Sequence, residues 1–257
     1  MTIRSTVPKV FVTPYLNRIN YRGSLTPSAE TLRNLQVAHL LSVPFENLSI
    51  HSHEPIVLND EALFDKIVGR RRGGFCYECN GLFAALLRAL GFQVSMLSAE
   101  VANESGGFSQ AFDHMTLMVK LEESWLVDVG FGDSFLEPLK IDISSEQFQG
   151  DQAFRIIADD AYRVVQRRRD REWKPEYRFT LQPYNYSDFE EMCRYHQTSP
   201  ESHFTKKRIC SLATSDGRIT VSDMLFIVTS NGLREERTLS NSQEYDEILH
   251  KQFGIKM

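Results

Sequence analysis

The sequence predicts an α+β protein with a helical region first, a region of strands next and a small α/β region last. Through residues 1–90, apolar side chains recur at three- and four-residue spacing, the period of a helix. From Phe92 they occur in short alternating runs typical of antiparallel strands. After the strands, one more helical pattern closes the chain. We place the region boundaries at 1–90, 91–197 and 198–257.

Capping residues indicate where the first helices begin. Thr13-Pro14 and Thr26-Pro27 each put a capping side chain before a proline suited to the first helical position. After Thr26, the residues Leu32, Leu35 and His39 share one helix face.

Two further helices are predicted before residue 92. Asn59 or Asp60 caps the first of them. Gly73-Gly74 then interrupts the pattern, and a second helix runs from about Cys76 to a stop at Gly91.

The strand region and the last region are read from alternation and turn residues. The predicted strands are "FQVSMLSAEV" (92–101), "HMTLMVKL" (114–121), "SWLVDVGF" (124–131), "YRVVQRR" (162–168), "YRFTLQPY" (177–184), "RICSLAT" (208–214), "GRITVS" (217–222) and "MLFIVTS" (224–230). Ser187 and Glu190 form a capping box for a helix that reaches about Gln197. A closing helix spans 243–253.

Composition narrows the class of protein. With 42% hydrophobic and 25% charged residues the chain reads as folded and not disordered, and a net charge of -5 argues against a general coat for nucleic acid or anionic membrane. The basic runs 70–72, 167–169 and 206–208 are interpreted mainly as solvated faces that could also meet a phosphorylated cofactor. The N-terminus lacks the apolar core of a signal peptide, and no apolar run has membrane-spanning length, so we expect a cytoplasmic protein whose four cysteines are thiols.

Cys76 is the first candidate for chemistry. A helix N-terminus favours the thiolate form of a cysteine in its first turn. The two preceding glycines allow positive φ and close approach of a substrate to the backbone, and nearby N–H groups could form an oxyanion hole.

His114 and Asp128 are candidate partners, because acyl transfer by a thiolate also uses an imidazole and a group that orients it. They lie on two consecutive predicted strands. A two-residue turn at 121–122 puts His114 opposite Val129, and one at 122–123 puts it opposite Phe131. Spacing alone therefore leaves contact with Asp128 open.

Cys76 and Cys79 also form a Cys-x-x-Cys pair. Structural zinc needs four ligands, but Cys193 and Cys210 form no second pair, which leaves His51 and His53 as the further candidates. A redox site of the thioredoxin type would follow a strand, whereas a helix is predicted before Cys76. Cys79 is most simply a packed neighbour.

Five motifs together resemble the arylamine N-acetyltransferases of bacterial type. They are "VPFENLSI" (43–50), "RGGFCYECNGLF" (72–83), "FDHMTLMV" (112–119), "WLVDVGFG" (125–132) and "RICSLAT" (208–214). The resemblance implies an N-terminal helical bundle, a central antiparallel β-barrel and a C-terminal α/β lid. It also implies a catalytic triad of Cys76, His114 and Asp128, of the kind found in cysteine peptidases and transglutaminases.

The resemblance further implies a ping-pong reaction. Cys76 takes the acetyl group of acetyl-CoA as a thioester and passes it to an arylamine, arylhydroxylamine or hydrazine, as in the metabolism of foreign amines. Phe45 and Phe131 are implied for the acceptor pocket, while Glu46 and Asn47 are read as residues that fix their loop. The residues implied for coenzyme A are Gly130, Phe204, Lys206 and Ser211. No metal is expected.

Two rival interpretations remain open on the residues alone. The same order of cysteine, histidine and aspartate suits a transglutaminase-like protein or a cysteine peptidase that acts on amides. In a binding module, Cys76 would be an unreactive structural thiol.

Overall fold

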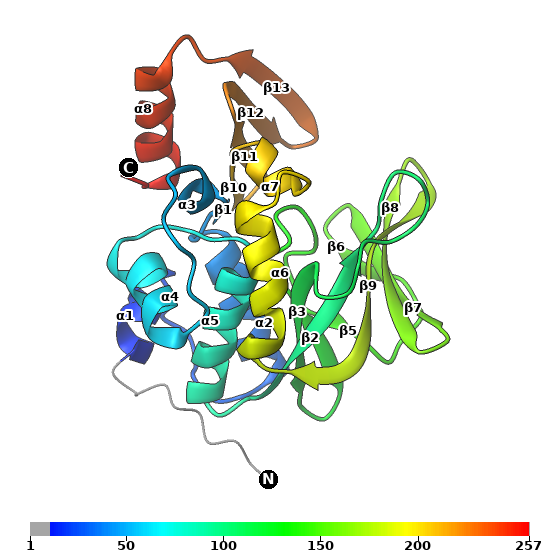
Figure 1. Cartoon of the computed structure of the whole chain (residues 1–257). Coiled ribbons are helices and arrows are strands. Elements are labelled where there is room, and N and C mark those ends of the chain that lie inside the picture. Colours follow the sequence, from blue (N-terminus) through cyan, green and yellow to red (C-terminus); the bar gives the residue numbers. More distant parts are fainter. Residues whose placement is uncertain (1–10, 257) are drawn as a thin grey trace.

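A computed structural model describes residues 11–256 of the chain, so the first ten residues of the predicted helical region lie outside the description. The helices are α1 (Val12–Arg18), α2 (Ala29–Leu40), α3 (Leu48–His51), α4 (Asp60–Phe64), the π-helical turn η2 (Asp65–Gly69), α5 (Cys76–Ala89), α6 (Tyr186–Thr198), α7 (His203–Lys206) and α8 (Ser242–Phe253). The α+β order of helices, barrel and lid predicted above is confirmed (Figure 1). Within 11–256, no helix has both the length and the apolar character needed to cross a membrane.

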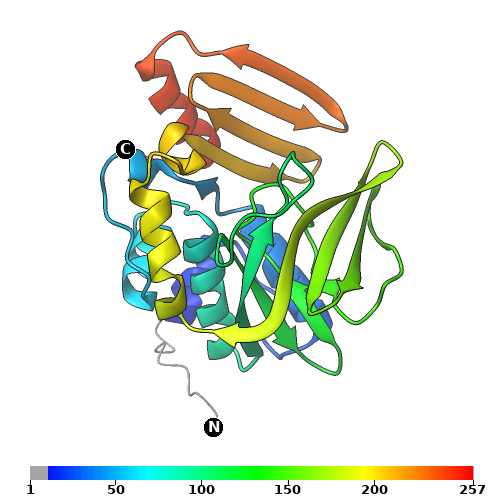
Figure 2. The same cartoon turned by 45° about the vertical axis from the view of Figure 1, so that its right-hand side comes forward.

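The central sheet has eight antiparallel strands in the order β5-β4-β3-β2-β9-β8-β7-β6. Their bounds are β2 (Gln93–Val101), β3 (His114–Lys120), β4 (Ser124–Val127), β5 (Leu139–Lys140), β6 (Gln147–Gln149), β7 (Gln152–Asp159), β8 (Tyr162–Arg169) and β9 (Glu172–Tyr184). The sheet curls into a nearly closed barrel (Figure 2). Side-chain amides join the two edges: Gln149 accepts the N–H groups of Leu136 and Glu137 at 2.9 and 3.0 Å, and Gln147 accepts that of Lys140 at 2.8 Å.

The second sheet has five strands in the order β1-β10-β11-β12-β13 and packs against α8, with which it forms the lid. Its strands are β1 (Phe45–Glu46), β10 (Ile209–Thr214), β11 (Gly217–Ser222), β12 (Leu225–Ser230) and β13 (Leu233–Thr238). Strand β1 belongs to the helical region in sequence, yet Phe45 pairs with Ser211 and Glu46 with Cys210. The "VPFENLSI" and "RICSLAT" motifs are therefore neighbouring strands, and this pairing crosses the predicted region boundaries.

Helix starts were predicted with mixed success. Asn59 caps α4 as expected, because its side chain accepts the Ala62 N–H at 2.8 Å. The cap of α2 is Ser28, whose Oγ accepts the Thr31 N–H at 3.1 Å. The prediction that Thr26 is the cap was wrong, because Pro27 lies before the helix and not at its first position.

Two further predicted starts were also wrong. Helix α1 begins before Thr13, at Val12, so Pro14 lies inside its first turn. Helix α6 begins after Asn185, whose N–H donates to Asp188 at 2.7 Å, and not at Ser187.

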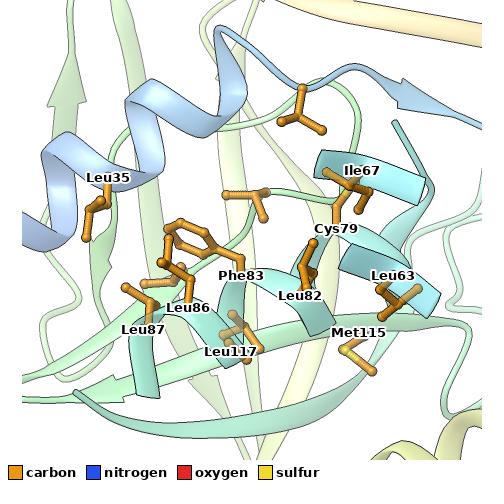
Figure 3. Close-up of a cluster of buried hydrophobic side chains, with 14 of the residues drawn as sticks. Leu35, Leu63, Ile67, Cys79, Leu82, Phe83, Leu86, Leu87, Met115 and Leu117 are labelled. Carbon is orange, nitrogen blue, oxygen red and sulfur yellow. The ribbon is translucent and has the colours of Figure 1, made fainter. Parts of the chain in front are cut away.

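Helix α5 is the centre of the core. It begins at Cys76 and ends before Gly91, which adopts a φ of +96° and so takes the left-handed conformation that favours glycine. Apolar side chains surround it from α2, α4, η2 and β3 (Figure 3). Because α5 is covered on nearly every side, its first turn is held in place by the whole helical bundle and by the barrel.

Replacing Phe83 by Ala should lower the free energy of unfolding by about 3–5 kcal/mol, since the ring is fully buried and its loss leaves a cavity. Urea denaturation measures this change. Leu233→Ala is the control, because Leu233 is 74% exposed, and its effect should stay within about 0.5 kcal/mol. Equal losses in both variants would contradict the central place of α5.

Candidate active site

Cys76 is the first residue of α5 and is almost fully buried, with 3% of its surface exposed. Cys76 lines a cavity of about 330 Å³. The first N–H groups of a helix have no carbonyl partner within it, so Cys76 lies beside free donors as well as beside the positive end of the helix dipole.

Gly73 and Gly74 serve a different purpose from the one predicted. Neither has positive φ. A Cβ on Gly73 would lie 1.9 Å from the Pro44 carbonyl oxygen, and one on Gly74 would lie 2.6 Å from Cβ of Glu78. The two glycines therefore leave room for the chain at Pro44, next to strand β1, and for the Glu78 side chain. The expectation that they leave room for a substrate was wrong.

His114 and Asp128 are in contact, although neither predicted register occurs. Lys120 pairs with Ser124 across a three-residue turn, and the β3–β4 ladder ends at Leu117 and Val127. Asp128 follows the last paired residue, which frees its side chain to turn toward His114, with 2.6 Å between Oδ2 and Nε2. Since Nε2 donates to the carboxylate, Nδ1 is the imidazole nitrogen left for another partner.

Asp128 is held as a carboxylate by its surroundings. Its Oδ1 accepts the Asn80 side-chain N–H and the Gly130 N–H, both at 2.9 Å. Burial alone would raise the pKa of Asp128, but His114 and these donors hold it below its usual value. The carboxylate can therefore orient the imidazole and stabilise an imidazolium.

Asn80 connects helix α5 to the barrel. It lies one turn after Cys76, and its amide donates to the Met115 carbonyl oxygen at 2.7 Å and accepts the Val129 N–H at 2.8 Å. Sequence reasoning missed Asn80, although a polar residue one turn after the cysteine in an otherwise apolar helix was a usable signal.

Gly130 allows the loop after β4 to approach Cys76. A Cβ on Gly130 would lie 2.7 Å from Cα of Cys76 and 2.8 Å from Nδ2 of Asn80. The contact excludes any side chain here, so Gly130 is needed for packing whether or not it also contacts a cofactor.

The helix N-terminus does not by itself ionise Cys76. Burial raises the pKa of the thiol well above its usual value, opposed by a hydrogen bond from the Met115 backbone and reinforced by the negative charges of Asp113 and Asp128. The expectation that the helix dipole favours the thiolate is thus outweighed by desolvation. A thiolate at this position needs a cation beside it.

The predicted acceptor residues line the same cavity as Cys76 and His114. Phe45 and Phe131 both do, together with Gly130 and Phe204. The Phe131 ring meets the His114 ring edge to face, with 5.2 Å between ring centres. The cavity is therefore lined by the aromatic rings of Phe45, Phe131 and Phe204 together with the polar side chains of Asp113 and His114.

A second cavity of about 390 Å³ continues from the first between the barrel and the lid. The two share Phe45, Phe131 and Ile209. Three arginines line the second cavity. Arg169 belongs to the basic run 167–169 that could meet a phosphorylated cofactor, whereas sequence reasoning did not single out Arg218 and Arg234.

Of the remaining residues implied for coenzyme A, Ser211 lines one of these two cavities and Lys206 lines neither. Ser211 lines the second cavity, where its Oγ accepts from Arg218 at 3.0 Å. Lys206 is exposed at the end of α7, 3.8 Å from Glu201, and it is its neighbour Lys207 that lines the first cavity.

A buried charge cluster supports the start of α5. Lys66 donates to Glu78 at 2.6 Å, and Arg72 is paired with Glu46 at 3.0 Å. Glu78 also accepts the N–H of Phe75, the residue before Cys76, at 3.1 Å. Burial opposes the charge on Lys66, but Glu78 and Glu46 raise its pKa and keep it a cation. Arg72 is thus buried and is not part of the solvated face predicted for residues 70–72.

Glu46 and Asn47 fix their loop as predicted. Glu46 accepts the Leu48 N–H at 2.6 Å. The Asn47 side chain donates to the carbonyl oxygens of Phe204 and Lys207 and accepts the Ile209 N–H, at 3.0, 2.7 and 2.8 Å. One amide therefore holds the start of the lid against the helical bundle.

Cys79 is a packed neighbour, as expected. It is fully buried and its thiol donates to the Gly74 carbonyl oxygen at 3.2 Å. Burial raises the pKa of the Cys79 thiol, which disfavours redox or metal chemistry. Within 11–256, no three side chains of His, Cys, Asp or Glu are grouped so that they could hold a metal ion.

The fold and the cavity together define a class of α+β protein. In this class a cysteine at a helix N-terminus shares a small aromatic-walled cavity with a histidine that is oriented by a carboxylate at the edge of a β-barrel. Such an arrangement suits acyl transfer through a thiol.

Comparison with known proteins identifies the family. Residues 28–257 match the N-acetyltransferase family model. The chain is 34% identical over 252 residues to arylamine N-acetyltransferase of Mycolicibacterium smegmatis, covering 95% of this chain and 91% of that one. It is 33% identical over 270 residues to a pineal gland isozyme of Gallus gallus, NAT-10, with 95% and 93% covered. The chain belongs to the arylamine N-acetyltransferase family and is an acetyltransferase.

A solved structure supports the same assignment. Arylamine N-acetyltransferase of Mycobacterium marinum in complex with CoA superposes with a TM-score of 0.89 at 31% identity, covering 95% of this chain and 92% of that one. The resemblance predicted from the five motifs is therefore confirmed.

Gly130→Ala should displace the loop after β4 and separate His114 from Cys76, because its added methyl group has no room. We expect a fall in activity toward arylamines of about 100-fold, the cost of misplacing reacting groups. Gly107→Ala is the control, since the nearest atom to its Cβ would be 3.4 Å away. A Gly130→Ala enzyme with unchanged activity would contradict the close approach described here.

Lys66→Met should cost about 3–5 kcal/mol of unfolding free energy, because it leaves Glu78 buried without its cation. The double variant Lys66→Met/Glu78→Gln should recover part of this loss. Chemical denaturation of both variants and of the parent tests the expectation. A double variant no more stable than the single one would show that the pair is not coupled.

Proposed function

We propose that the chain transfers an acetyl group from acetyl-CoA to the nitrogen of an arylamine, arylhydroxylamine or hydrazine through an acetyl thioester on Cys76. The observation that carries the proposal is the shared cavity of Cys76 and His114, with Asp128 bound to the far side of the imidazole. Cys76 is the nucleophile, His114 the base, and Asp128 the group that orients the base.

Ionisation is the first step. The Cys76 proton moves to Nδ1 of His114 and leaves a thiolate beside an imidazolium, a pair with no net charge. The buried Asp128 stabilises the imidazolium, which compensates the burial that raises the thiol pKa.

The thiolate then attacks the thioester carbonyl of acetyl-CoA. The backbone N–H groups of Cys76 and Tyr77, the first two of α5, can donate to the oxygen that becomes negative. His114 protonates the departing CoA sulfur, and the acetyl group stays on Cys76 as a new thioester. Exchange of one thioester for another conserves the reactivity of the acyl group.

The acceptor enters the same cavity. Phe45, Phe131 and Phe204 provide aromatic surface for its ring. Its nitrogen attacks the acetyl carbon, passes a proton to His114 and releases the Cys76 thiolate.

For the CoA portion, we assign the second cavity between barrel and lid. Its arginines Arg169, Arg218 and Arg234 suit the phosphates of the nucleotide, and Ser211 lies among them. Gly130 and Phe204 line the inner cavity, where the acyl-bearing end of the cofactor would lie. Lys206 has the weakest support of the predicted residues. The cytoplasmic location expected from the sequence stays a prediction.

Mass spectrometry tests the proposal. Mixing the protein with acetyl-CoA and no acceptor should add one acetyl group, which is absent in Cys76→Ser and is removed by an arylamine. An unchanged mass would exclude the thioester route and would favour the amide-cleaving rival with the same residues.

Thiol alkylation near neutral pH tests the roles of the partners. His114→Ala should slow alkylation of Cys76 by at least ~100-fold, because the proton has no acceptor. Asp128→Asn should also slow it sharply. Alkylation of either variant at the parent rate would rule out the triad.

A further inference from the structure

A second carboxylate lies in the cavity, and the triad does not use it. Asp113 lines the cavity together with Cys76 and His114, and 13% of its side chain is exposed. Two residues adjacent in sequence normally point to opposite faces of a strand. Asp113 escapes this rule because it precedes the first residue of β3 and lies in a turn.

The turn before Asp113 has an uncommon backbone. Phe112 has a φ of +66°, which is rare for a bulky residue. It is held there by two hydrogen bonds: its N–H donates to Ser98 Oγ at 2.7 Å, and its carbonyl oxygen accepts from the Tyr77 hydroxyl at 2.6 Å. Strained backbone that neighbouring groups maintain is concentrated at functional sites.

The Asp113 carboxylate lies at the end of a row of polar side chains. Ser202 Oγ accepts the Phe204 N–H at 3.2 Å and is also hydrogen-bonded to Nδ1 of His196, 3.0 Å away. His196 Nε2 lies 3.2 Å from Asp113 Oδ1, close enough for an ion pair but without hydrogen-bond geometry. Burial opposes ionisation of Asp113, but the neighbouring His196 and Ser109 side chains hold its pKa below the usual value.

This negative charge disfavours the first half of the reaction. Asp113 raises the pKa of the Cys76 thiol, and so makes the thiolate harder to form. The effect changes sign once the acetyl group is on sulfur. Cys76 then carries no charge, and the attacking nitrogen becomes positive as its bond to carbon forms.

We propose that Asp113 accepts an N–H of the attacking amine or hydrazine and stabilises the positive charge on that nitrogen during transfer from acetyl-Cys76. This inference rests on the proposed function. An arylamine has two N–H groups: one proton goes to Nδ1 of His114, and the other N–H donates to Asp113. The nitrogen lone pair forms the N–C bond, the C–S bond breaks, and the electron pair of that bond leaves with the Cys76 thiolate beside the His114 imidazolium.

The test uses Asp113→Asn, which keeps the shape of the side chain and removes its charge. Acetyl-Cys76 is prepared with acetyl-CoA, freed of excess reagent, and mixed in parallel with 4-methoxyaniline or with CoA. A thiol acceptor develops no positive nitrogen. We expect discharge to 4-methoxyaniline to slow by about 100-fold, because its transition state loses one charged partner. Discharge to CoA should not slow, because the thiolates of that exchange gain nothing from a negative neighbour. The pH profile of Cys76 alkylation should move to lower pH.

Other outcomes of this experiment would overturn either the role of Asp113 or the proposed function. Discharge to 4-methoxyaniline at the parent rate, or an equal slowing with both acceptors, would overturn the role of Asp113. If the parent protein never forms acetyl-Cys76, the proposed function itself fails. Asp246→Asn is the matched control, because Asp246 is exposed on α8, and it should leave both discharge rates unchanged.

Discussion

The contact between the first turns of α5 and the loop after β4 is the constraint on which the site depends. Nucleophile and base belong to different parts of the fold, and three groups hold these parts together. Asn80 hydrogen-bonds to β3 and to the Asp128 loop, Asp128 bonds to His114, and Gly130 lets the loop backbone lie against Cys76. A helix packed on a barrel by apolar contacts alone could shift by a fraction of a turn. The buried amide permits only one position.

The same junction explains how Cys76 can be both buried and reactive. Burial makes the thiolate costly, and two carboxylates near the cavity add to that cost. The imidazole of His114 offsets both, because proton transfer across the cavity creates no net charge. The same rule holds at the start of α5. There the buried charge of Glu78 is paired with that of Lys66. The centre therefore relies on paired charges.

Much of the fold could be predicted from the sequence, and the failures have physical causes. Helix α5 was found because a glycine interrupts the pattern at each end, and the contact of His114 with Asp128 was left open because strand register depends on a turn whose length was unknown. Strand β13 reads "LREERT", is wholly exposed and has no apolar alternation to detect. The arginines of the second cavity meet only through long-range packing. The order of the five motifs indicated the family, and the match of the family model to residues 28–257 confirms it.

The central claim is that Cys76 ionises only together with His114. The most direct test follows the thiolate by its ultraviolet absorbance and the His114 ring by nitrogen NMR in one pH titration, with Cys76→Ser as the reference. The account predicts that thiolate and imidazolium appear and disappear together, and that the thiolate signal near neutral pH is lost in His114→Ala. A thiolate that persists beside a neutral imidazole, or in the absence of His114, would contradict it.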